Sequence, residues 1–265
     1  IKKEIKELNN IKNLEVKTRT SVAAYHGYNY LLARENLTDH LENKDKQGKI
    51  RQRLLKIRAK KVILATGALE RPLIFNNNDR PGIMLSSAIK KYADFYGVVS
   101  GKKNVFFTNN DSAYESALCL HNKGIKVEAI IDIRESSNSK IVKAVENVGI
   151  KIHWSHTIVD TKGYKRLNSI SVMRLSNDGL SVTGNKIDIS CDCLGVAGGW
   201  TPAVHLFTQS GGKLKFDEKN KVFLPNKYPS DQLSVGSCNG HFYLKEIINN
   251  LSTNLKEFLK IDKTD

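Results

Sequence analysis

The chain has 265 residues, and its 42 lysines and arginines exceed its 27 aspartates and glutamates, giving a formal net charge of +15. This length allows two modest domains with a buried core. No run of about 18 apolar residues and no signal-peptide pattern is present, so we expect a soluble cytoplasmic protein that does not enter a membrane. A basic charge can indicate a nucleic-acid partner, but the lysines are scattered and no nucleic-acid motif accompanies them. We therefore expect that these lysines fill the surface and that no nucleic acid binds.

The first part of the chain predicts one helix followed by a β-meander. Ile1, Ile5 and Leu8 recur with helical spacing, and the chain opens inside this pattern without a Met, so we expect a piece of a longer protein. Apolar runs separated by polar turns then indicate strands. The predicted elements are a helix over residues 1–11 and strands near 14–16, on either side of Gly27 within 21–33, at 54–57 and at 62–64.

The middle of the chain alternates strand and helix patterns with short connections, which is typical of a parallel sheet. It begins after the turn-rich segment Asn76–Gly82, where we place a domain crossing. The predicted elements are strands at 104–108, 127–133 and 150–154 and helices at 86–96, 112–123 and 139–148. Beyond them we expect antiparallel strands at 165–174 and 184–189, a strand at 192–197, a second crossing at 198–202 and a closing helix at 247–259.

The turn after the predicted strand at 104–108 stands where a Rossmann unit carries its three phosphate-binding glycines. Thr108, Asn110 and Ala113 occupy those positions. A Cβ at the first two crowds the tight turn and the approach of a pyrophosphate, so we predict that no dinucleotide binds here. Alternatively, Asn109, Asn110 and Asp111 cap the following helix and bond a subunit partner, with Asp111 or Ser112 as the best N-cap.

The cysteines and histidines show no pattern typical of catalysis or metal binding. Cys191 and Cys193 are two apart on a predicted strand, so we expect them to share one face as buried small hydrophobic residues. His153 and His156 are three apart near a strand end, so we expect them on different faces, in structural or surface roles. Neither a C-x-x-C nor a hydrolase motif occurs. The sequence therefore predicts no catalytic residue and no metal site in this piece.

A first binding-site candidate is formed by Ala65, Thr66 and Gly67, at the end of the β-rich run VILATG. Small residues let the backbone approach a bound nucleotide closely, and the Thr66 hydroxyl can reach its sugar-phosphate region. The alternative is a tight turn that touches no ligand. Arg71, which precedes Pro72, either faces a phosphate through bidentate contacts or anchors the linker between the domains.

Longer motifs carry a family resemblance. The chain resembles the alpha subunit of heterotetrameric sarcosine oxidase from about residue 19 to residue 240, on the motifs ATGALERPLIFNNNDRPGIMLSSA, FTNNDSAY, GGWTPAVHLFTQSGGKLKFDE and SVGSCNG. Related alpha subunits occur in opine dehydrogenases and hydrogen cyanide synthase. The resemblance implies an α/β fold with two nested Rossmann-like dinucleotide-binding domains of the glutathione-reductase type, the first truncated at its N-terminus. We assign residues 1–75 plus 198–265 to the outer domain and 76–197 to the inserted one.

The resemblance also implies cofactors and partners. In this family the alpha subunit holds NAD noncovalently, while FAD and FMN belong mainly to the beta subunit. The complex of alpha, beta, gamma and delta subunits oxidatively demethylates sarcosine to glycine, with formaldehyde or 5,10-methylenetetrahydrofolate and hydrogen peroxide as further products. Tetrahydrofolate binds a C-terminal domain that we do not find here. We therefore expect this piece alone to be inactive and to bind NAD weakly or not at all.

Three further cofactor-binding residues rest on the resemblance. Gly236 and Ser237, within SVGSCNG, resemble the second cofactor motif of flavoprotein reductases, in which an Asp follows the glycine. Ser237 removes that charge-assisted acceptor, which favours a nucleotide held without a redox flavin; the alternative is a tight turn before the last helix. Family geometry places the backbone of Val22 against an adenine, and the alternative is an ordinary strand valine. The central expectation is that Thr66 and Gly236 lie close together.

Other functions compete with this interpretation. The same class of protein includes the alpha subunit of another FAD-dependent amine or opine dehydrogenase and a stand-alone flavin-dependent reductase. A different class is a non-catalytic module that only holds subunits together. A basic nucleic-acid binder is the least favoured, since it would need a salt-sensitive basic surface that no motif indicates.

Overall fold

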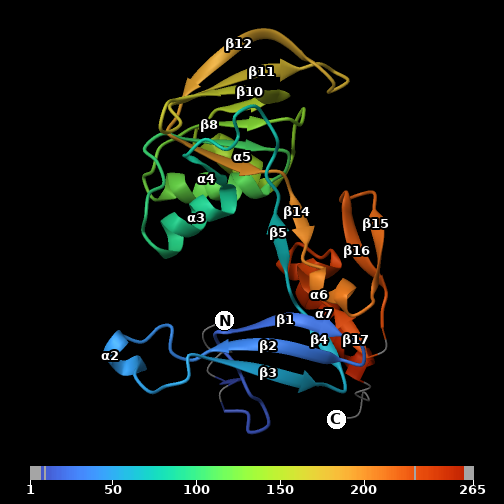
Figure 1. The fold of residues 1–265 in the computed structure, drawn as a ribbon. Helices are drawn as coiled ribbons and strands as arrows, with labels where there is room; N and C mark the ends of the chain where they lie inside the picture. The colour runs from blue at the N-terminus through green and yellow to red at the C-terminus, as the bar shows by residue number, and fades with distance from the viewer. Residues whose placement is uncertain (1–6, 9, 230, 260–265) are drawn as a thin grey trace. The chain divides into compact units, whose positions relative to one another are not determined.

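The chain forms two compact units in the computed structural model, which describes residues 7–8, 10–229 and 231–259 (Figure 1). Unit 1 comprises Ile1–Ala68 and Pro202–Asp265, and unit 2 comprises Leu69–Thr201. The chain passes between them through two short strands that pair with each other, β5 (Ala68–Glu70) and β14 (Trp200–Pro202). The helix predicted over residues 1–11 lies largely outside the described residues.

Unit 2 is built on a parallel sheet of five strands in the order β6-β13-β7-β8-β9. The strands are β6 (Ile83–Leu85), β7 (Asn104–Thr108), β8 (Val127–Asp132), β9 (Ile152–Trp154) and β13 (Cys193–Ala197). Every residue of β7 and β13 is buried, as expected for parallel strands covered on both faces. The predicted parallel sheet and its β-α-β-α-β order are confirmed, and the fold is a Rossmann-like α/β fold.

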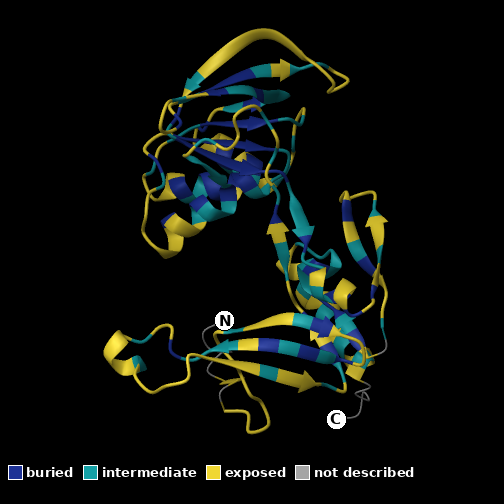
Figure 2. Cartoon of the chain, in the orientation of Figure 1, coloured by how far each residue is buried: buried dark blue, intermediate teal, exposed yellow. Residues whose placement is uncertain are grey.

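Different layers cover the two faces of this sheet (Figure 1). Three helices pack on one face, and an antiparallel sheet of three strands packs on the other. The covering elements are α3 (Ser86–Phe95), α4 (Ser112–Asn122), α5 (Lys140–Asn147), β10 (His156–Lys162), β11 (Ser169–Leu175) and β12 (Val182–Ser190). Alternate residues of β7 serve the two layers, with Phe106 facing the helices and Phe107 facing the antiparallel sheet. Figure 2 shows the resulting buried band through the middle of unit 2.

Cys191 and Cys193 are both buried, as predicted, but they do not share a face. Cys193 belongs to the core beneath the helices, and Cys191 belongs to the core beneath the antiparallel sheet. The reason is that Cys191 lies before β13 begins, so the two-residue repeat of a strand does not apply to the pair. Burial raises the pKa of each thiol to about 12, so both cysteines stay protonated at neutral pH.

Unit 1 combines a meander, a parallel pair and a hairpin around a small core (Figure 1). The meander is β1 (Thr20–His26), β2 (Tyr30–Asn36) and β3 (Gln52–Arg58), with the short α2 (Asn43–Lys46) between the last two strands. The other elements are β4 (Val62–Leu64), α6 (His205–Gln209), β15 (Lys213–Asp217), β16 (Val222–Lys227), β17 (Gln232–Ser234), the 3₁₀ turn η1 (Gly236–Asn239) and α7 (Leu244–Leu259). Tyr25, Val62, Leu64 and Phe207 are buried together in this core. A Cβ on Gly212 would lie 2.5 Å from the Phe207 ring, so only glycine permits this packing.

Several local predictions differ from the structure. Leu14–Val16 forms no strand, because these residues join no described sheet. Leu14 is 43% exposed and Val16 is 56% exposed, so neither side chain is buried against a core. The predicted strand at 150–154 ends at Ser155, whose φ of 55° turns the chain directly into the unpredicted β10. The closing helix at 247–259 is confirmed as α7, which buries none of its residues. None of the helices in the described part of the chain combines the length and apolarity needed to cross a bilayer.

Candidate functional site

The ends of β4 and β17 meet at one edge of unit 1. The two strands pair in parallel, with Val62 opposite Gln232 and Leu64 opposite Ser234. The Val235 backbone N–H donates to the Leu64 carbonyl at 2.9 Å, which extends the pairing past the strand ends. Because both strands run in the same direction, Ala65–Gly67 and Gly236–Ser237 leave the sheet at the same edge. The structure thus brings together five of the seven predicted binding residues.

Both glycines at this edge have a left-handed backbone. Gly67 has a φ of 75° and Gly236 a φ of 72°, a region that residues with a Cβ rarely adopt. A Cβ on Gly67 would meet no other atom within 4 Å, and one on Gly236 would only touch Ile247 at 3.9 Å. The space in front of Gly67 is therefore open. The geometry fits a ligand that packs directly against the backbone, as a dinucleotide does.

The polar side chains at this edge are neutral. The Thr66 hydroxyl donates to the Ala203 carbonyl at 2.7 Å, and the Ala203 N–H donates to the Gly67 carbonyl at 2.9 Å, so the turn is held to the start of the segment after β14. Ser237 lies in η1, half-exposed. Ala65 and Thr66 are exposed. None of these groups can act as a general acid or base at neutral pH, which suits binding and not bond breaking.

The two remaining predicted residues lie elsewhere. Val22 is in β1, in the meander of unit 1, beside a β-bulge and 40% exposed. Arg71 belongs to unit 2, where its N–H donates to Gly199 O at 2.8 Å and its carbonyl accepts from Gly198 N–H at 2.6 Å. Its guanidinium lies 3.0 Å from where a Cβ on Gly199 would be. These contacts favour the anchoring role that we considered for Arg71 over a phosphate contact.

The turn between β7 and α4 in unit 2 has a different character. The Thr108 hydroxyl donates to the Ala197 carbonyl at 3.0 Å and accepts from the Asn110 N–H at 3.1 Å. The Asn110 side chain donates to the same carbonyl at 3.0 Å and accepts from the Ser112 N–H at 3.0 Å. The side chains at the first two glycine positions therefore bond to their own turn and to the neighbouring strand end.

The cap of α4 differs from the prediction. Asp111 occupies the N-cap position, but its side chain makes no capping hydrogen bond. Asn110 caps the helix instead, by accepting from the Ser112 backbone N–H. The predicted N-cap position, Asp111, is therefore confirmed, but the capping side chain is Asn110 and not Asp111 or Ser112. The cause is Arg134, whose Nη1 lies 2.8 Å from Asp111 Oδ1 and directs that carboxylate away from the helix.

A buried ion-pair network lies behind this turn, and sequence reasoning missed it. Asp132, fully buried at the end of β8, accepts from Arg134 Nη2 and from the Tyr114 hydroxyl, each at 2.7 Å. Burial and the Asp132 charge raise the pKa of Tyr114 above its ordinary value. In a Rossmann unit, an acidic residue about 20 residues after the last glycine binds a ribose hydroxyl. That spacing from Ala113 is the signal that points to Asp132, whose oxygens here bond to protein groups.

The chain is similar to part of longer known proteins. It is 38% identical over 226 residues to sarcosine oxidase subunit alpha of Corynebacterium sp. (strain P-1), which covers 84% of this chain and 23% of that protein. It is 33% identical over 219 residues to sarcosine oxidase subunit alpha of Rhizobium meliloti (strain 1021), which covers 82% and 21%. The chain thus spans less than a quarter of the length of these relatives. The similarities confirm the resemblance to sarcosine oxidase alpha subunits.

Solved structures share the fold at low sequence identity. L-proline dehydrogenase from P. horikoshii has a TM-score of 0.60 at 21% identity, over 89% of this chain and 40% of that one. Thioredoxin reductase from T. acidophilum has a TM-score of 0.60 at 15% identity, over 91% of this chain and 72% of that one. No family model matches the chain. These likenesses support the Rossmann-like α/β fold and, at such identities, nothing finer.

Proposed function

We propose, from the confirmed similarity to sarcosine oxidase alpha subunits, that this chain is the nucleotide-binding portion of such a subunit, and that unit 1 holds the nucleotide where β4 and β17 end. The observation that carries the proposal is the convergence of two left-handed glycines, Gly67 and Gly236, on one edge of a parallel pair with open space in front of Gly67. Such an edge is where α/β sheets bind their ligands.

The bound nucleotide is NAD, held noncovalently. Ser237 stands where flavoprotein reductases have an Asp, so the chain offers no carboxylate at this place to accept from a flavin's ribityl or ribose hydroxyl. Ala65, Thr66 and Gly67 position the sugar-phosphate part, and Val22 approaches the adenine. When bound, a nicotinamide dinucleotide supplies hydride-accepting chemistry. No residue at this edge carries a charge for catalysis, so the amine oxidation belongs to FAD and FMN, mainly on the beta subunit.

Unit 1 is the incomplete outer dinucleotide-binding domain that we predicted over residues 1–75 plus 198–265, although it ends earlier, at Ala68, and resumes later, at Pro202. Parallel sheets are normally covered on both faces by other elements. The pair formed by β4 and β17 has only two strands, and Ile63 within it is 42% exposed. These features support a domain whose first βαβ unit, with the pyrophosphate turn, is supplied by preceding sequence. The 265-residue chain alone should therefore bind NAD weakly.

Unit 2 is the inserted second Rossmann-like domain that we predicted over residues 76–197, although it extends from Leu69 to Thr201, and it serves as a scaffold toward partner subunits. The bonds of Thr108 and Asn110 to Ala197, and of Asp132 to Arg134, use the groups that would otherwise face a pyrophosphate and a ribose. Their internal pairing supports a unit without its own dinucleotide. The partners are the beta, gamma and delta subunits, and tetrahydrofolate binds a domain beyond this segment.

The test uses the full-length alpha subunit purified with its partners. After denaturation, the released NAD, FAD and FMN are quantified and compared with the amount of each subunit. We expect about one NAD per alpha subunit, lowered severalfold in Gly67→Ala but unchanged in Gly27→Ala, which replaces a glycine with open surroundings and no left-handed backbone. No NAD in the wild-type complex would favour a non-catalytic assembly module.

The substrate is tested on the same preparation. The complex should oxidise sarcosine with release of hydrogen peroxide, and the product glycine should appear in equal amount. Oxidation of an opine or another secondary amine in place of sarcosine would instead assign the chain to a related amine or opine dehydrogenase. The two outcomes leave the nucleotide measurement unaffected, so substrate and nucleotide site are judged separately.

A further inference from the structure

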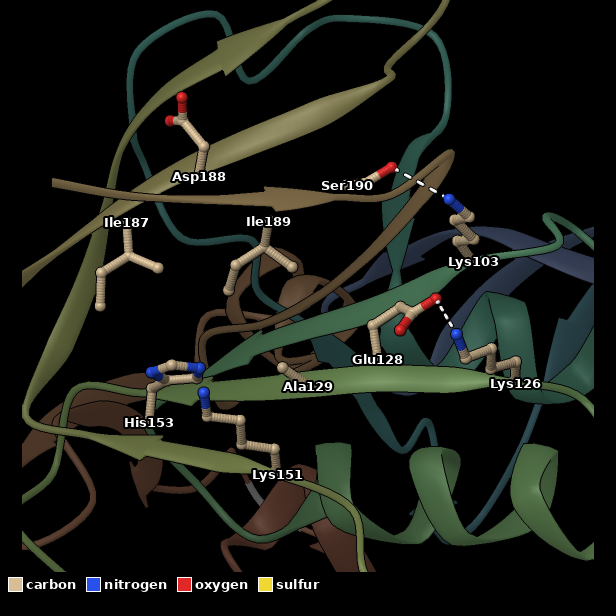
Figure 3. A pocket seen from close by; sticks show the side chains of 10 residues that line it. All are labelled: Lys103, Lys126, Glu128, Ala129, Lys151, His153, Ile187, Asp188, Ile189 and Ser190. Atoms are coloured by element: carbon tan, nitrogen blue, oxygen red, sulfur yellow. Dashed lines mark hydrogen bonds and ion pairs between the residues drawn. The ribbon is translucent and has the colours of Figure 1, made fainter.

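Unit 2 has a basic pocket near the amino ends of its parallel strands, away from the turn that follows β7 (Figure 3). Its cavity measures about 380 Å³. Lys103, Lys126 and Lys151 each directly precede one of three neighbouring parallel strands, β7, β8 and β9. Parallel topology therefore gathers three lysines at the amino ends of adjacent strands. Ligands of α/β sheets normally bind at the carboxyl ends, so this pocket is separate from any nucleotide site.

The backbones of these lysines are fixed. The Lys151 carbonyl accepts from the Ile130 N–H at 2.8 Å, and the Lys126 carbonyl accepts from the Asn104 N–H at 3.2 Å. The Lys103 carbonyl accepts from the Asp192 N–H at 3.1 Å. Each side chain thus starts from a backbone position that a hydrogen bond fixes. A ligand that bridges them needs little rearrangement of the protein.

The acidic groups around the pocket are already paired. Lys126 Nζ lies 2.8 Å from Glu128 Oε1, so these two charges offset each other. Asp188 points away from the pocket, as Figure 3 shows, and lies 2.5 Å from Lys162 Nζ. Lys103 Nζ donates to the neutral Ser190 hydroxyl at 3.3 Å, and neither Lys103 Nζ nor Lys151 Nζ forms an ion pair with a described residue. The Asp192 carboxylate, next to Lys103 in the fold, accepts from the backbone N–H groups of Lys102 and Lys103. Two positive charges therefore remain without a counter-charge.

A buried histidine points into the same pocket. His153 of β9 is 9% exposed, makes no hydrogen bond with a described residue, and carries its ring toward the cavity (Figure 3). Our expectation that His153 and His156 lie on different faces is wrong, since their ring centroids are 5.4 Å apart. The left-handed Ser155 between them turns the chain and brings both rings to one side. Ile187 and Ile189 of β12 supply an apolar wall opposite the histidine, and Ala129 of β8 lies beside it.

We propose that this pocket binds a small organic dianion with a short apolar body, held by Lys103 and Lys151, with His153 as a further donor. Two lysines without counter-charges match two negative charges, and Lys is a common point-charge partner of phosphate and carboxylate groups. The apolar wall contacts the carbon skeleton, and the cavity is within the range of small-molecule sites. The site is independent of the nucleotide proposed for unit 1.

The pH dependence of binding follows from the groups around His153. Burial, Lys151 and His156 lower the pKa of His153, because each disfavours the imidazolium. The acidic residues nearest in the fold, Glu128 of β8 and Asp188 of β12, are paired with Lys126 and Lys162. A bound dianion would place negative charge beside the ring and favour its protonation. Binding should therefore raise the pKa of His153, whereas a phosphate or carboxylate dianion itself loses a charge as the pH falls below about 6.

The test is titration calorimetry of the full-length alpha subunit, purified with its partners, with glycerol 3-phosphate, succinate and acetate. We expect saturable binding of one or both dianions with a Kd of about 1 mM, and much weaker binding of acetate. The stronger of the two dianions identifies the preferred head group. Lys151→Met and Lys103→Met should each weaken binding about tenfold. Lys151→Arg, which keeps the charge, and Lys91→Met, at an exposed lysine of α3, should bind as the wild type.

A separate readout follows His153 itself. Glycerol 3-phosphate or succinate should shift the NMR signals of the His153 ring and raise the pH at which the ring titrates, and His153→Gln should weaken binding. Circular dichroism confirms that each variant is folded. The proposal is overturned if neither dianion binds, if acetate binds equally well, or if Lys151→Met and Lys91→Met give the same affinity as the wild type.

Discussion

Two strand ends in this chain, one in each unit, differ in whether their backbone is accessible to a ligand. At the edge formed by β4 and β17, Gly67 and Gly236 have left-handed backbones, and the space in front of Gly67 is open. At the end of β7, Thr108 and Asn110 bond to each other and to Ala197. One edge keeps its backbone accessible, while the other satisfies its polar groups internally. A Rossmann-like fold therefore does not by itself predict a nucleotide, and the hydrogen-bond partners at the strand end decide.

Arg134→Met should have the largest effect on the closed strand end. Asp132 is fully buried, and removing Arg134 leaves its charge without a cation, which typically costs about 3 kcal/mol or more. We expect a corresponding loss in the free energy of unfolding, followed by urea denaturation with the fluorescence of Trp154, whose ring lies 6.2 Å from that of Tyr114. Arg134→Lys should recover part of the loss, since it keeps the charge but not the fork. Equal stability of Arg134→Met and wild type would show that the network carries no stability.

Asn110→Ala should have the next largest effect. The variant loses the side-chain bonds to Ala197 and to the Ser112 N–H, including the cap of α4, at a cost of about 2 kcal/mol. Asn109→Ala is the matched control, because among the described contacts Asn109 accepts only from Asn110. Thermal unfolding of both variants measures the difference. If both lose the same stability, the internal bonding of the turn does not depend on Asn110.

Gly67→Ala tests the open edge. A Cβ at a φ of 75° costs about 1 kcal/mol of strain, although it meets no protein atom. We expect this small loss of stability together with a much larger loss of bound NAD in the assembled complex. Gly27→Ala, whose Cβ also meets nothing within 4 Å but whose backbone is not left-handed, should change neither quantity. Full NAD content in Gly67→Ala would separate this turn from the nucleotide.

Tyr114→Phe gives the smallest effect and one that depends on pH. Burial and Asp132 raise the pKa of Tyr114 above the value near 10 that it has in the unfolded chain. The folded state therefore resists ionisation, and this contribution is present below about pH 10 and is lost as the pH rises further. Tyr114→Phe should cost about 1 kcal/mol at pH 7 through the lost bond to Asp132 and should flatten the decline above pH 10. If the free energy of unfolding falls equally steeply above pH 10 in Tyr114→Phe and in the wild type, the raised pKa of Tyr114 is contradicted.

Much of the fold follows from local patterns in the sequence. The runs at Val105–Phe107 and Ile130–Ile131 are apolar because parallel strands are buried on both faces, and this pattern is visible without coordinates. The close approach of Ala65–Gly67 and Gly236 was predicted with the help of the family resemblance, which pointed to Gly236 as part of a second cofactor motif.

Features that depend on a single backbone angle or a distant partner were not predictable. Ser155 adopts a left-handed backbone that residue type does not favour, and this one residue both ends β9 and begins β10. Arg134 draws Asp111 away from the cap of α4, although the two residues are far apart in sequence. The basic pocket was missed because its lysines are scattered along the chain and meet only through the order of the parallel strands.

Hydrogen exchange of the assembled complex tests the central claim most directly. The full-length alpha subunit with its partners would be compared before and after removal of NAD. The account predicts that NAD slows exchange at residues 62–68 and 232–240 and leaves residues 108–113 unchanged. Slower exchange at 108–113, with no change at the other two segments, would contradict it and would assign the nucleotide to the asparagine-rich turn.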